Sequence, residues 1–262
     1  MRVRVATSPR ISVVTPSFNQ AEFLEATLRS VLDQRYPNLE FIVMDGGSSD
    51  GSAALIERYA SQLAYSQSRP DGGQTDALIQ GFARATGDIF CWLNSDDLFE
   101  PGTLAEVADH FVHHPDRFVY GDATWIDRDG AFLKRKREIP FYRWIWLRTY
   151  NYIPQPSAFW SRDLYEEVGG LDASFDLAMD ADLFARFSER TRPRHVRRLW
   201  SRMRFYPEQK NIRLRSRSDL EDDLIRRRYV TPKGPRWEVE RIVARTARVA
   251  VRAASGAYGP AR

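Results

Sequence analysis

Apolar positions along the first hundred residues follow two alternating periods. Short continuous apolar runs fit buried strands, and each is followed by a segment in which apolar residues recur three and four positions apart, as on one face of a helix. The predicted strands are Ile11–Thr15, Leu39–Met44 and Ile89–Leu93, and the predicted helices are Glu22–Gln34, Ser52–Leu63 and Gln74–Ala85. This order predicts a mostly parallel α/β sheet that is covered by helices.

The pattern changes after residue 100. The segment Phe118–Lys136 reads as short strands around a turn at Asp127–Gly130, which adds antiparallel pieces to the sheet. Further helices are predicted at Leu104–Phe111, Ser161–Val168 and Leu177–Ser188. Because no clear linker interrupts the chain before about Tyr206, we expect one domain over residues 1–205 and a basic helical extension over residues 206–262.

Composition is ordinary for a soluble globular protein, with 43% hydrophobic and 28% charged residues among 262. A single cysteine, Cys91, excludes an internal disulfide and a zinc site built from several cysteines. Residues 1–10 lack the apolar core of a signal peptide, and no run approaches the roughly 20 apolar residues that span a bilayer. We therefore expect a cytoplasmic protein.

The net charge of +4 hides an uneven distribution of charge. Basic residues gather after Arg190, where the main acidic group is Glu221–Asp223. Their positions are Arg192, Arg194, Arg197, Arg198, Arg202, Arg204, Lys210, Arg213, Arg215, Arg217 and Arg226–Arg228. A surface of this kind suits an anionic partner, which can be a diphosphate, an anionic lipid or a nucleic acid.

The most chemically informative segment is Asn94–Asp97, directly after the predicted strand Ile89–Leu93. Two adjacent carboxylates at the end of a buried strand repel each other, which costs folding free energy unless a cation or hydrogen-bond donors offset it. Ligands of open α/β sheets bind at the carboxyl ends of strands, and Mg²⁺ takes one or two carboxylates together with phosphate oxygens. A metal-bound phosphate compound and an ordinary solvated turn both fit these four residues.

Three other polar clusters stand at the ends of predicted strands or the start of a helix: Thr15–Asn19, Asp45–Ser48, and Asp180 with Asp182. The first two would share one edge of the sheet with Asn94–Asp97. The glycines of the second cluster permit a ligand to approach the backbone closely, and Asp45 can accept hydrogen bonds from a base or a sugar. An ordinary connection that ends in a helix cap explains the same cluster.

A longer ordered set of motifs contains these clusters. It comprises Pro16–Asn19, Val43–Ser52, Gly72–Ala77, Trp92–Asp97, Tyr120–Asp122, Pro154–Ser157, Val168–Asp172 and Ala178–Leu183. This set, over roughly residues 10–190, resembles the inverting family 2 glycosyltransferases. The resemblance implies the GT-A fold, a doubly wound, Rossmann-like mixed sheet flanked by helices. Its nucleotide-binding half would cover about residues 10–100 and its acceptor-binding half about residues 101–205.

The resemblance also implies roles residue by residue. Asp180 corresponds to the catalytic base, although a carboxylate favoured by the helix macrodipole explains the same position. Asp96 and Asp97 correspond to the acidic motif that binds Mg²⁺ or Mn²⁺, with Asp97 as the preferred direct ligand and Asp96 nearer the ribose. The nucleotide-sugar site would comprise Thr15, Pro16, Ser17, Asn19, Asp45, Gly46, Gly47, Gln74, Asp76 and Asp96.

The implied activity is that of a metal-dependent, inverting glycosyltransferase of the hexosyltransferase type. It would move a sugar from a UDP-sugar or another nucleotide sugar to a hydroxyl of a saccharide or lipid-linked saccharide, in the synthesis of cell-surface polysaccharide or glycolipid. A divalent ion would neutralise the diphosphate leaving group, and a carboxylate on the opposite face of the sugar would act as general base for an in-line attack that inverts the anomeric centre.

Three positions depart from the family pattern. Asn94 is a neutral residue at the first acidic position, Ile79–Gln80 stands where polar or basic residues are common, and Tyr206 lies where many relatives carry a histidine. A third protein ligand of the metal therefore cannot be assigned, and Lys210 or a nearby arginine could bind the diphosphate instead.

Single features of the sequence argue for or against three other functions. A nucleotidyltransferase would need a basic, glycine-rich phosphate loop, which Thr15–Asn19 lacks. A nucleic-acid-binding protein could use the arginine-rich last third, but that segment has no recognisable recognition fold, so no nucleic-acid partner is expected. Asn94 and Tyr206 keep open a non-catalytic glycosyltransferase-like subunit, whereas Asp96, Asp97 and Asp180 argue against it.

The extension ends in a predicted amphipathic helix. Arg241, Arg245, Arg248 and Arg252 form one helical row, and apolar residues occupy other parts of its surface. Such a helix can lie on an anionic membrane, as a peripheral contact at the inner face of the cell membrane, or it can dock on its own domain or on a second subunit.

Overall fold

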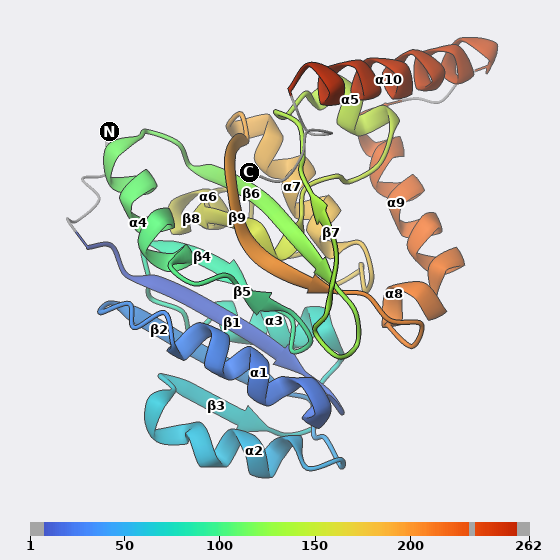
Figure 1. Cartoon of the computed structure of the whole chain (residues 1–262). Helices are drawn as coiled ribbons and strands as arrows, with labels where there is room; N and C mark the ends of the chain where they lie inside the picture. The colour runs from blue at the N-terminus through green and yellow to red at the C-terminus, as the bar shows by residue number, and fades with distance from the viewer. Residues whose placement is uncertain (1–7, 231–233, 256–262) are drawn as a thin grey trace.

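The computed structural model describes residues 8–230 and 234–255, and Figure 1 labels its elements. The strands are β1 (Ile11–Ser17), β2 (Leu39–Asp45), β3 (Tyr65–Ser68), β4 (Ile89–Trp92), β5 (Leu98–Phe99), β6 (Phe118–Ile126), β7 (Phe132–Lys136), β8 (Ala158–Ser161) and β9 (Arg194–Arg204). The helices are α1 (Ala21–Leu32), α2 (Ser52–Tyr59), α3 (Gln74–Phe82), α4 (Thr103–His113), α5 (Arg143–Arg148), α6 (Arg162–Glu167), α7 (Met179–Arg190), α8 (Lys210–Arg213), α9 (Arg215–Tyr229) and α10 (Gly234–Ala254). Short 3₁₀ turns cover Ala60–Gln62 and Gln155–Ser157.

Within the described residues the strands form one mixed sheet. Its order is β3-β2-β1-β4-β8-β6-β9-β5, and β7 pairs with β6 outside this path. The first four strands are parallel, whereas β8 pairs antiparallel with both β4 and β6. The antiparallel pieces predicted after residue 100 are confirmed, because β6 and β7 pair antiparallel.

Two strands lie in segments without a continuous apolar run. The four residues of β3 read Tyr-Ser-Gln-Ser, and this edge strand is defined by its parallel pairing with β2. Strand β9 is rich in arginine, yet it pairs in parallel with β6 from Val119 to Ile126. Tertiary pairing therefore sets these strands, and the pairing of β9 brings Arg204 to the turn after β4.

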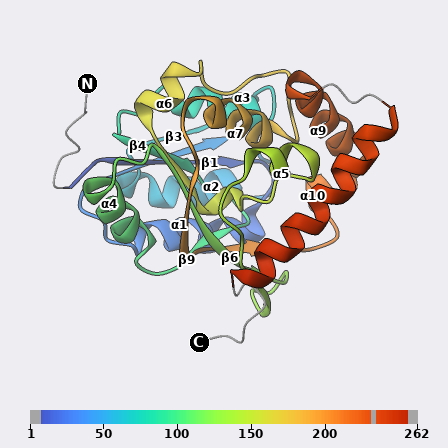
Figure 2. The same ribbon diagram turned by 90° about the horizontal axis from the view of Figure 1, so that it is seen from above.

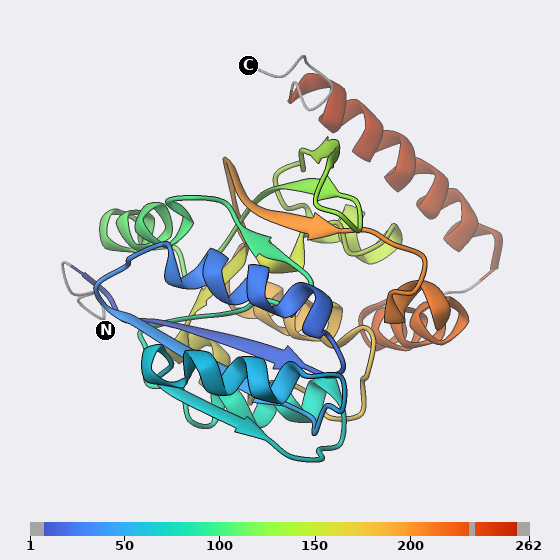
Figure 3. The ribbon, with the colours of Figure 1, turned by 60° about the horizontal axis from the view of Figure 1, so that its bottom comes forward.

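Side chains alternate along β1, β2 and β4, so the sheet has a core on each face. Val14, Ile42 and Trp92 belong to one core together with side chains of α3, α6 and α7. Phe41 and Cys91 belong to the other core, with side chains of α1, α2 and α4. Figure 3 shows α1 and α2 lying together in front of the sheet. Helices on both faces of a mixed sheet confirm the predicted α/β class.

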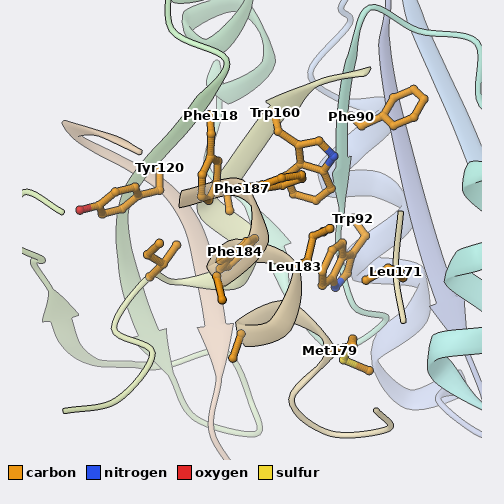
Figure 4. Packing of buried hydrophobic residues seen from close by; sticks show 14 of the residues in the cluster. Phe90, Trp92, Phe118, Tyr120, Trp160, Leu171, Met179, Leu183, Phe184 and Phe187 are labelled. Carbon is orange, nitrogen blue, oxygen red and sulfur yellow. The ribbon is translucent and has the colours of Figure 1, made fainter. Parts of the chain in front are cut away.

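Helix α7 is fixed by an aromatic cluster beneath it. The ring centroid of Phe118 lies 4.9 Å from that of Phe184 and 5.2 Å from that of Phe187, and Phe187 also lies 5.6 Å from Trp160. Figure 4 shows these rings gathered between α7 and the strands. Truncating one such buried ring to alanine costs about 3–5 kcal/mol. The first turn of α7, which carries Asp180, is thereby held in place.

The last helix, α10, packs against α5, as Figures 1 and 2 show from two directions. Arg148 pairs with Glu240 at 2.9 Å. Arg248, a member of the predicted arginine row, points inward, where it pairs with Glu138 at 3.4 Å and lies over the ring of Tyr150. The helix is therefore docked on its own domain through part of that row. Among residues 8–230 and 234–255 we find no helix with the length and apolarity needed to traverse a bilayer.

Candidate active site

A pocket of about 840 Å³ opens at the carboxyl ends of β1, β2 and β4. The loops after these strands, the start of α7 and the segment between β9 and α8 together line it. The structure brings most of the predicted site residues to its wall, namely Pro16, Ser17, Gly46, Gly47, Gln74, Asp96, Asp97 and Asp180.

The acidic turn after β4 is held from two directions. The Thr27 hydroxyl on α1 lies 2.9 Å from the carbonyl oxygens of both Ser95 and Asp97, which share its one hydrogen. From the end of β9, the main-chain nitrogen of Arg204 donates to Asp97 Oδ1 at 2.9 Å, and Arg204 Nε donates to the Asp96 carbonyl at 2.9 Å. The turn is therefore a rigid part of the fold, although its side chains carry like charges.

The two carboxylates of this turn have different surroundings. Asp97 is buried, and burial together with the neighbouring Asp96 raises the pKa of Asp97 well above its usual range, while donors from Arg204 and Asn94 only partly oppose this. Asp96 is more exposed and accepts hydrogen bonds from the Tyr206 hydroxyl at 3.0 Å and from Gln209 Nε2 at 3.3 Å. The protein's own donors and the Arg204 charge thus only partly offset the cost of ionising Asp97, and a bound divalent cation would favour its ionised form.

The departure at Asn94 has a structural explanation. Asn94 Oδ1 accepts a hydrogen bond from Gln74 Nε2 at 2.9 Å, and Asn94 Nδ2 donates to Gln155 Oε1 at 3.3 Å. Gln155 Nε2 in turn donates to the Trp92 carbonyl at 2.8 Å. This row of amides links the α3 side of the pocket to the 3₁₀ turn at residues 155–157. An aspartate at position 94 could not donate to Gln155, so the row depends on the amide.

Asp71 is a pocket residue that the sequence motifs did not single out. It lies directly before the motif Gly72–Ala77, and its side chain faces Gly46, where an added Cβ would lie 3.1 Å from Asp71 Oδ1. Burial and the charges of Asp76 and Asp45 raise the pKa of Asp71. The only sequence signal was its position next to a motif, because its proximity to Gly46 comes from the pairing of β2 with β3.

Asp180 stands in the first turn of α7, and both of its carboxylate oxygens have donors. Asn151 Nδ2 donates to Oδ2 at 2.9 Å, and the main-chain nitrogen of Ala181 donates to Oδ1 at 2.8 Å. Burial raises the pKa of Asp180 to about 6, and the charge of Asp222 adds to this rise while that of Lys136 opposes it. A carboxylate with a pKa near neutrality that reaches a pocket is suited to take up a proton.

Comparisons with known proteins identify the family. Residues 12–167 match the model of glycosyl transferase family 2. An uncharacterised glycosyltransferase of Mycobacterium tuberculosis is 34% identical over 185 residues, which are 70% of each chain. The O-antigen biosynthesis protein RfbC of Myxococcus xanthus is 32% identical over 197 residues, which cover 72% of this chain and 15% of that protein.

The chain belongs to glycosyltransferase family 2. Solved structures agree in fold. The mannosyltransferase PcManGT of Pyrobaculum calidifontis, solved with GDP-Man and Mn²⁺, superposes with a TM-score of 0.66 at 20% identity over 97% of this chain and 76% of that one. Residues 1–349 of S. aureus TarS with UDP-GlcNAc give a TM-score of 0.64 at 16% identity over 78% and 60%. The expected GT-A fold is confirmed, and the protein is a glycosyltransferase.

Four predicted nucleotide-site residues of this glycosyltransferase are absent from the described pocket wall: Thr15, Asn19, Asp45 and Asp76. Asp45 is fully buried, and its carboxylate accepts hydrogen bonds from the hydroxyls of Ser48 and Ser68, both at 2.6 Å. Asn19 accepts one from the main-chain nitrogen of Ser49. Asp45 and Asn19 thus organise the loop after β2, and direct contact of these four residues with a nucleotide stays a prediction.

The same loop explains why glycine is needed at position 47. Gly47 has a φ of +82°, and an added Cβ would lie 2.9 Å from the nitrogen of Pro70. Any other residue would therefore meet both backbone strain and a clash with backbone. Nearby, the buried hydroxyl oxygen of Ser17 has no hydrogen-bond partner within the described chain, and Ser17 lines the pocket. A ligand with polar groups would satisfy that hydroxyl.

Proposed function

We propose that this enzyme is a metal-dependent, inverting glycosyltransferase that moves a sugar from a nucleotide sugar to an acceptor hydroxyl. The observation that carries the proposal is the placement of two acidic sites in one pocket. Asp96 and Asp97 lie in the turn after β4, Asp180 lies in the first turn of α7, and all three line the pocket. The proposed reaction uses two such acidic sites, one for the metal that neutralises the leaving diphosphate and one for the base that takes the proton of the attacking hydroxyl.

The residues present fit a divalent ion of the Mg²⁺ or Mn²⁺ type. No group of three histidine, cysteine or acidic side chains that could hold a metal occurs among the described residues. Two adjacent carboxylates are nevertheless what Mg²⁺ needs from a protein when phosphate oxygens and waters complete its shell. Asp96 and Asp97 would hold the ion, which when bound supplies charge neutralisation for the diphosphate.

Asp180 is the proposed base. Its Oδ2 accepts a hydrogen bond from Asn151 Nδ2, and because a carboxylate oxygen has two lone-pair directions, Oδ2 can also accept a proton from an acceptor hydroxyl. Attack from this side with departure of the diphosphate toward Asp96 and Asp97 is a single displacement, which inverts the anomeric centre. The alternative, a helix-terminal carboxylate without a chemical role, does not require the residue to reach the pocket, which it does.

The nature of donor and acceptor is a further part of the proposal. Structural neighbours were solved with UDP-GlcNAc and with GDP-Man, and one relative is named for O-antigen biosynthesis. These names support a UDP-sugar or another nucleotide sugar as donor, and a saccharide or lipid-linked saccharide as acceptor in cell-surface polysaccharide or glycolipid synthesis.

A donor screen tests the proposed activity. Release of nucleoside diphosphate is measured for a panel that includes UDP-GlcNAc and GDP-mannose, with and without Mn²⁺, for the wild type and Asp97→Ala. We expect one donor to be turned over only with metal, and we expect Asp97→Ala to lose both turnover and the metal response. Turnover that is indifferent to metal and to Asp97 would refute metal dependence. No binding or turnover of any donor would favour the non-catalytic subunit.

We also propose that the enzyme acts as a peripheral protein at the cytoplasmic face of the membrane, through α10. Four β-branched side chains at helical spacing face away from the domain, and each is between 51% and 61% exposed: Val239, Ile242, Val243 and Val249. Arg236 and Arg245 on the same helix are also exposed. An apolar face beside exposed cations suits an anionic bilayer. The apolar face, rather than the whole arginine row, is the proposed contact, because Arg248 is occupied by Glu138.

Vesicle flotation of the full chain tests this contact. We expect the wild type to float with phosphatidylcholine vesicles only when they contain phosphatidylglycerol, and we expect the pair Ile242→Asp with Val243→Asp to remain unbound. The matched control pair is Leu220→Asp with Leu224→Asp, which adds the same charge to exposed leucines of α9. Equal flotation of both pairs would overturn the proposal. Self-association that only the α10 pair abolishes would assign the face to a second copy of the chain.

A further inference from the structure

We infer that Asn151 is the positioning residue of the proposed base, and that its amide sets both the direction and the proton affinity of the Asp180 carboxylate. The inference rests on the proposed role of Asp180. Asn151 precedes β8 in the segment that follows α5, so it belongs to a different part of the sequence from the α7 residue that it contacts. Its Nδ2 lies 2.9 Å from Asp180 Oδ2.

The direction of the Asn151 amide is fixed by its other partners. Asn151 Oδ1 accepts hydrogen bonds from Trp146 Nε1 at 3.3 Å and from the main-chain nitrogen of Ile153 at 3.2 Å. Both partners can only donate, so the oxygen must face them and the NH₂ group must face Asp180. The amide therefore always presents a donor, and a donor stabilises the ionised form of a carboxylate.

The support behind Asn151 is itself buried. Trp146 is fully buried, and its carbonyl accepts a hydrogen bond from the Arg226 guanidinium of α9 at 2.6 Å. Arg226 is also paired with Asp222, at 2.7 Å. Helix α9 thus holds the main chain of Trp146, whose indole orients the amide, and this couples the extension after residue 205 to the proposed base.

The Asn151 amide acts on Asp180 in a different way from the charged groups around it. Asp222, on α9, raises the pKa of Asp180, and Lys136, on β7, lowers it. Both charged groups have ion-pair partners of their own. Asp222 is paired with Arg226, and Lys136 lies 3.9 Å from Glu138. Arg248 of α10 also contacts Glu138. Asn151 is the neutral side chain that donates directly to the carboxylate, so it can hold the ionised form in one orientation without adding charge.

Asn151→Asp is the sharpest test. The variant keeps the shape of the side chain and an acceptor for Trp146 and Ile153, but it replaces the donor to Asp180 by a second carboxylate. Two adjacent carboxylates repel each other when both are ionised, so the pKa at which Asp180 becomes available as a base should rise. We expect the ascending limb of the plot of kcat against pH to move to higher pH by about one pH unit or more. The Kd of the nucleotide sugar should stay within about twofold of the wild-type value.

The assay is release of nucleoside diphosphate from UDP-GlcNAc or GDP-mannose with Mn²⁺, over a pH series, with thermal melts of every variant. Thr149→Ala is the matched control, because its hydroxyl lies in the same segment and bonds only the Ile145 carbonyl among the described contacts. Asn151→Ser is a neutral second variant, for which a smaller shift in the same direction is expected.

The outcomes are distinguishable. A folded Asn151→Asp and a folded Asn151→Ser that keep the wild-type limb would overturn the inference, and so would a loss of kcat without any shift, since that is what structural damage alone produces. Asp180→Asn is measured in the same series. If Asp180→Asn retains turnover, the proposed base is wrong; if it loses turnover while both Asn151 variants behave as wild type, the base stands and the positioning role fails.

Discussion

Asp97 Oδ1 accepts a hydrogen bond from the main-chain nitrogen of Arg204 at 2.9 Å, across 107 positions of sequence. The contact joins the turn after β4 to the end of β9, and the Arg204 side chain adds a bond to the Asp96 carbonyl. The main-chain donor holds the carboxylate in place, and the charge of the Arg204 side chain opposes the pKa rise caused by burial and Asp96 only in part. The turn is thus preorganised for a cation while the repulsion between its carboxylates persists.

The first prediction concerns the stability cost of that charge. Burial raises the pKa of Asp97 in the folded state, so the metal-free protein loses stability as the pH rises above the ordinary aspartate value of about 4. Asp97→Asn keeps an acceptor for Arg204 and removes the charge. We expect it to raise the Tm of the metal-free protein at neutral pH by a few degrees, since 1 kcal/mol is worth about 2–4 °C at this size.

Thermal melts with and without Mn²⁺ check this prediction. The wild type should gain Tm with Mn²⁺, and Asp97→Asn should not. Asp219→Asn removes an exposed carboxylate of α9 and serves as the control, with no expected change in either condition. A less stable Asp97→Asn that still responds to Mn²⁺ would count against both the buried charge and the metal site.

The second prediction concerns Asp180. A base must be ionised to accept a proton, and the pKa of Asp180 is raised to about 6, so turnover should climb with pH through about 6 and then level off. Asp180→Asn should lower turnover by about 10²–10⁴-fold, the usual contribution of a general base. Donor binding, followed by calorimetry, should be retained. A flat pH profile of the wild type through this range would contradict the assignment.

Much of this site could be predicted because its residues lie in local patterns. The strand ends of β1, β2 and β4 are visible as apolar runs followed by polar residues, and the parallel order then brings Ser17, Gly47 and Asp97 to one edge. Asp180 was reached through the motif around it rather than through periodicity. Features that depend on a few consecutive residues can be recognised from a single sequence.

The contacts that tune the site could not be predicted in this way. Arg204 and Asn151 act on aspartates that are far from them in sequence, and nothing local marks either residue as a partner. The edge strand β3 has no apolar run, and Asp71 reaches the pocket only because β3 pairs with β2. Such relationships are set by tertiary pairing, which a pattern of neighbouring residues does not encode.

The third prediction concerns Tyr206, which lies where many family members carry a histidine. The Tyr206 hydroxyl donates to Asp96 Oδ2 at 3.0 Å, and its ring lies 5.0 Å from that of Phe23. Tyr206→Phe keeps the ring contact and removes the donor. Because a hydrogen bond to a charged group contributes about 1.5–3 kcal/mol, we expect the half-saturating concentration of Mn²⁺ or the donor KM to change by about tenfold.

The direction of that change is informative. A rise means that Tyr206 positions Asp96 for the metal, whereas a fall means that the hydroxyl competes with the metal for the carboxylate. Tyr59→Phe is the control, since its hydroxyl bonds Glu25 on the surface and does not reach the pocket. Kinetics of Tyr206→Phe that match those of Tyr59→Phe would show that the contact has no part in the site.

The last prediction returns to the neutral residue of the acidic turn. Asn94→Asp keeps the acceptor for Gln74 but loses the donor to Gln155, and it places a third carboxylate beside Asp96 and Asp97. We expect a lower Tm without metal, because like charges accumulate in a buried turn. We also expect tighter binding of Mn²⁺, by about tenfold, because a charged ligand replaces a neutral one at the edge of the site.

Titration calorimetry with Mn²⁺ measures the change in affinity, and Asn38→Asp, on the surface, supplies the control. An unchanged affinity for Mn²⁺ would mean that position 94 faces the amide row alone, so that the asparagine is kept for the Gln74–Gln155 connection and not for the metal.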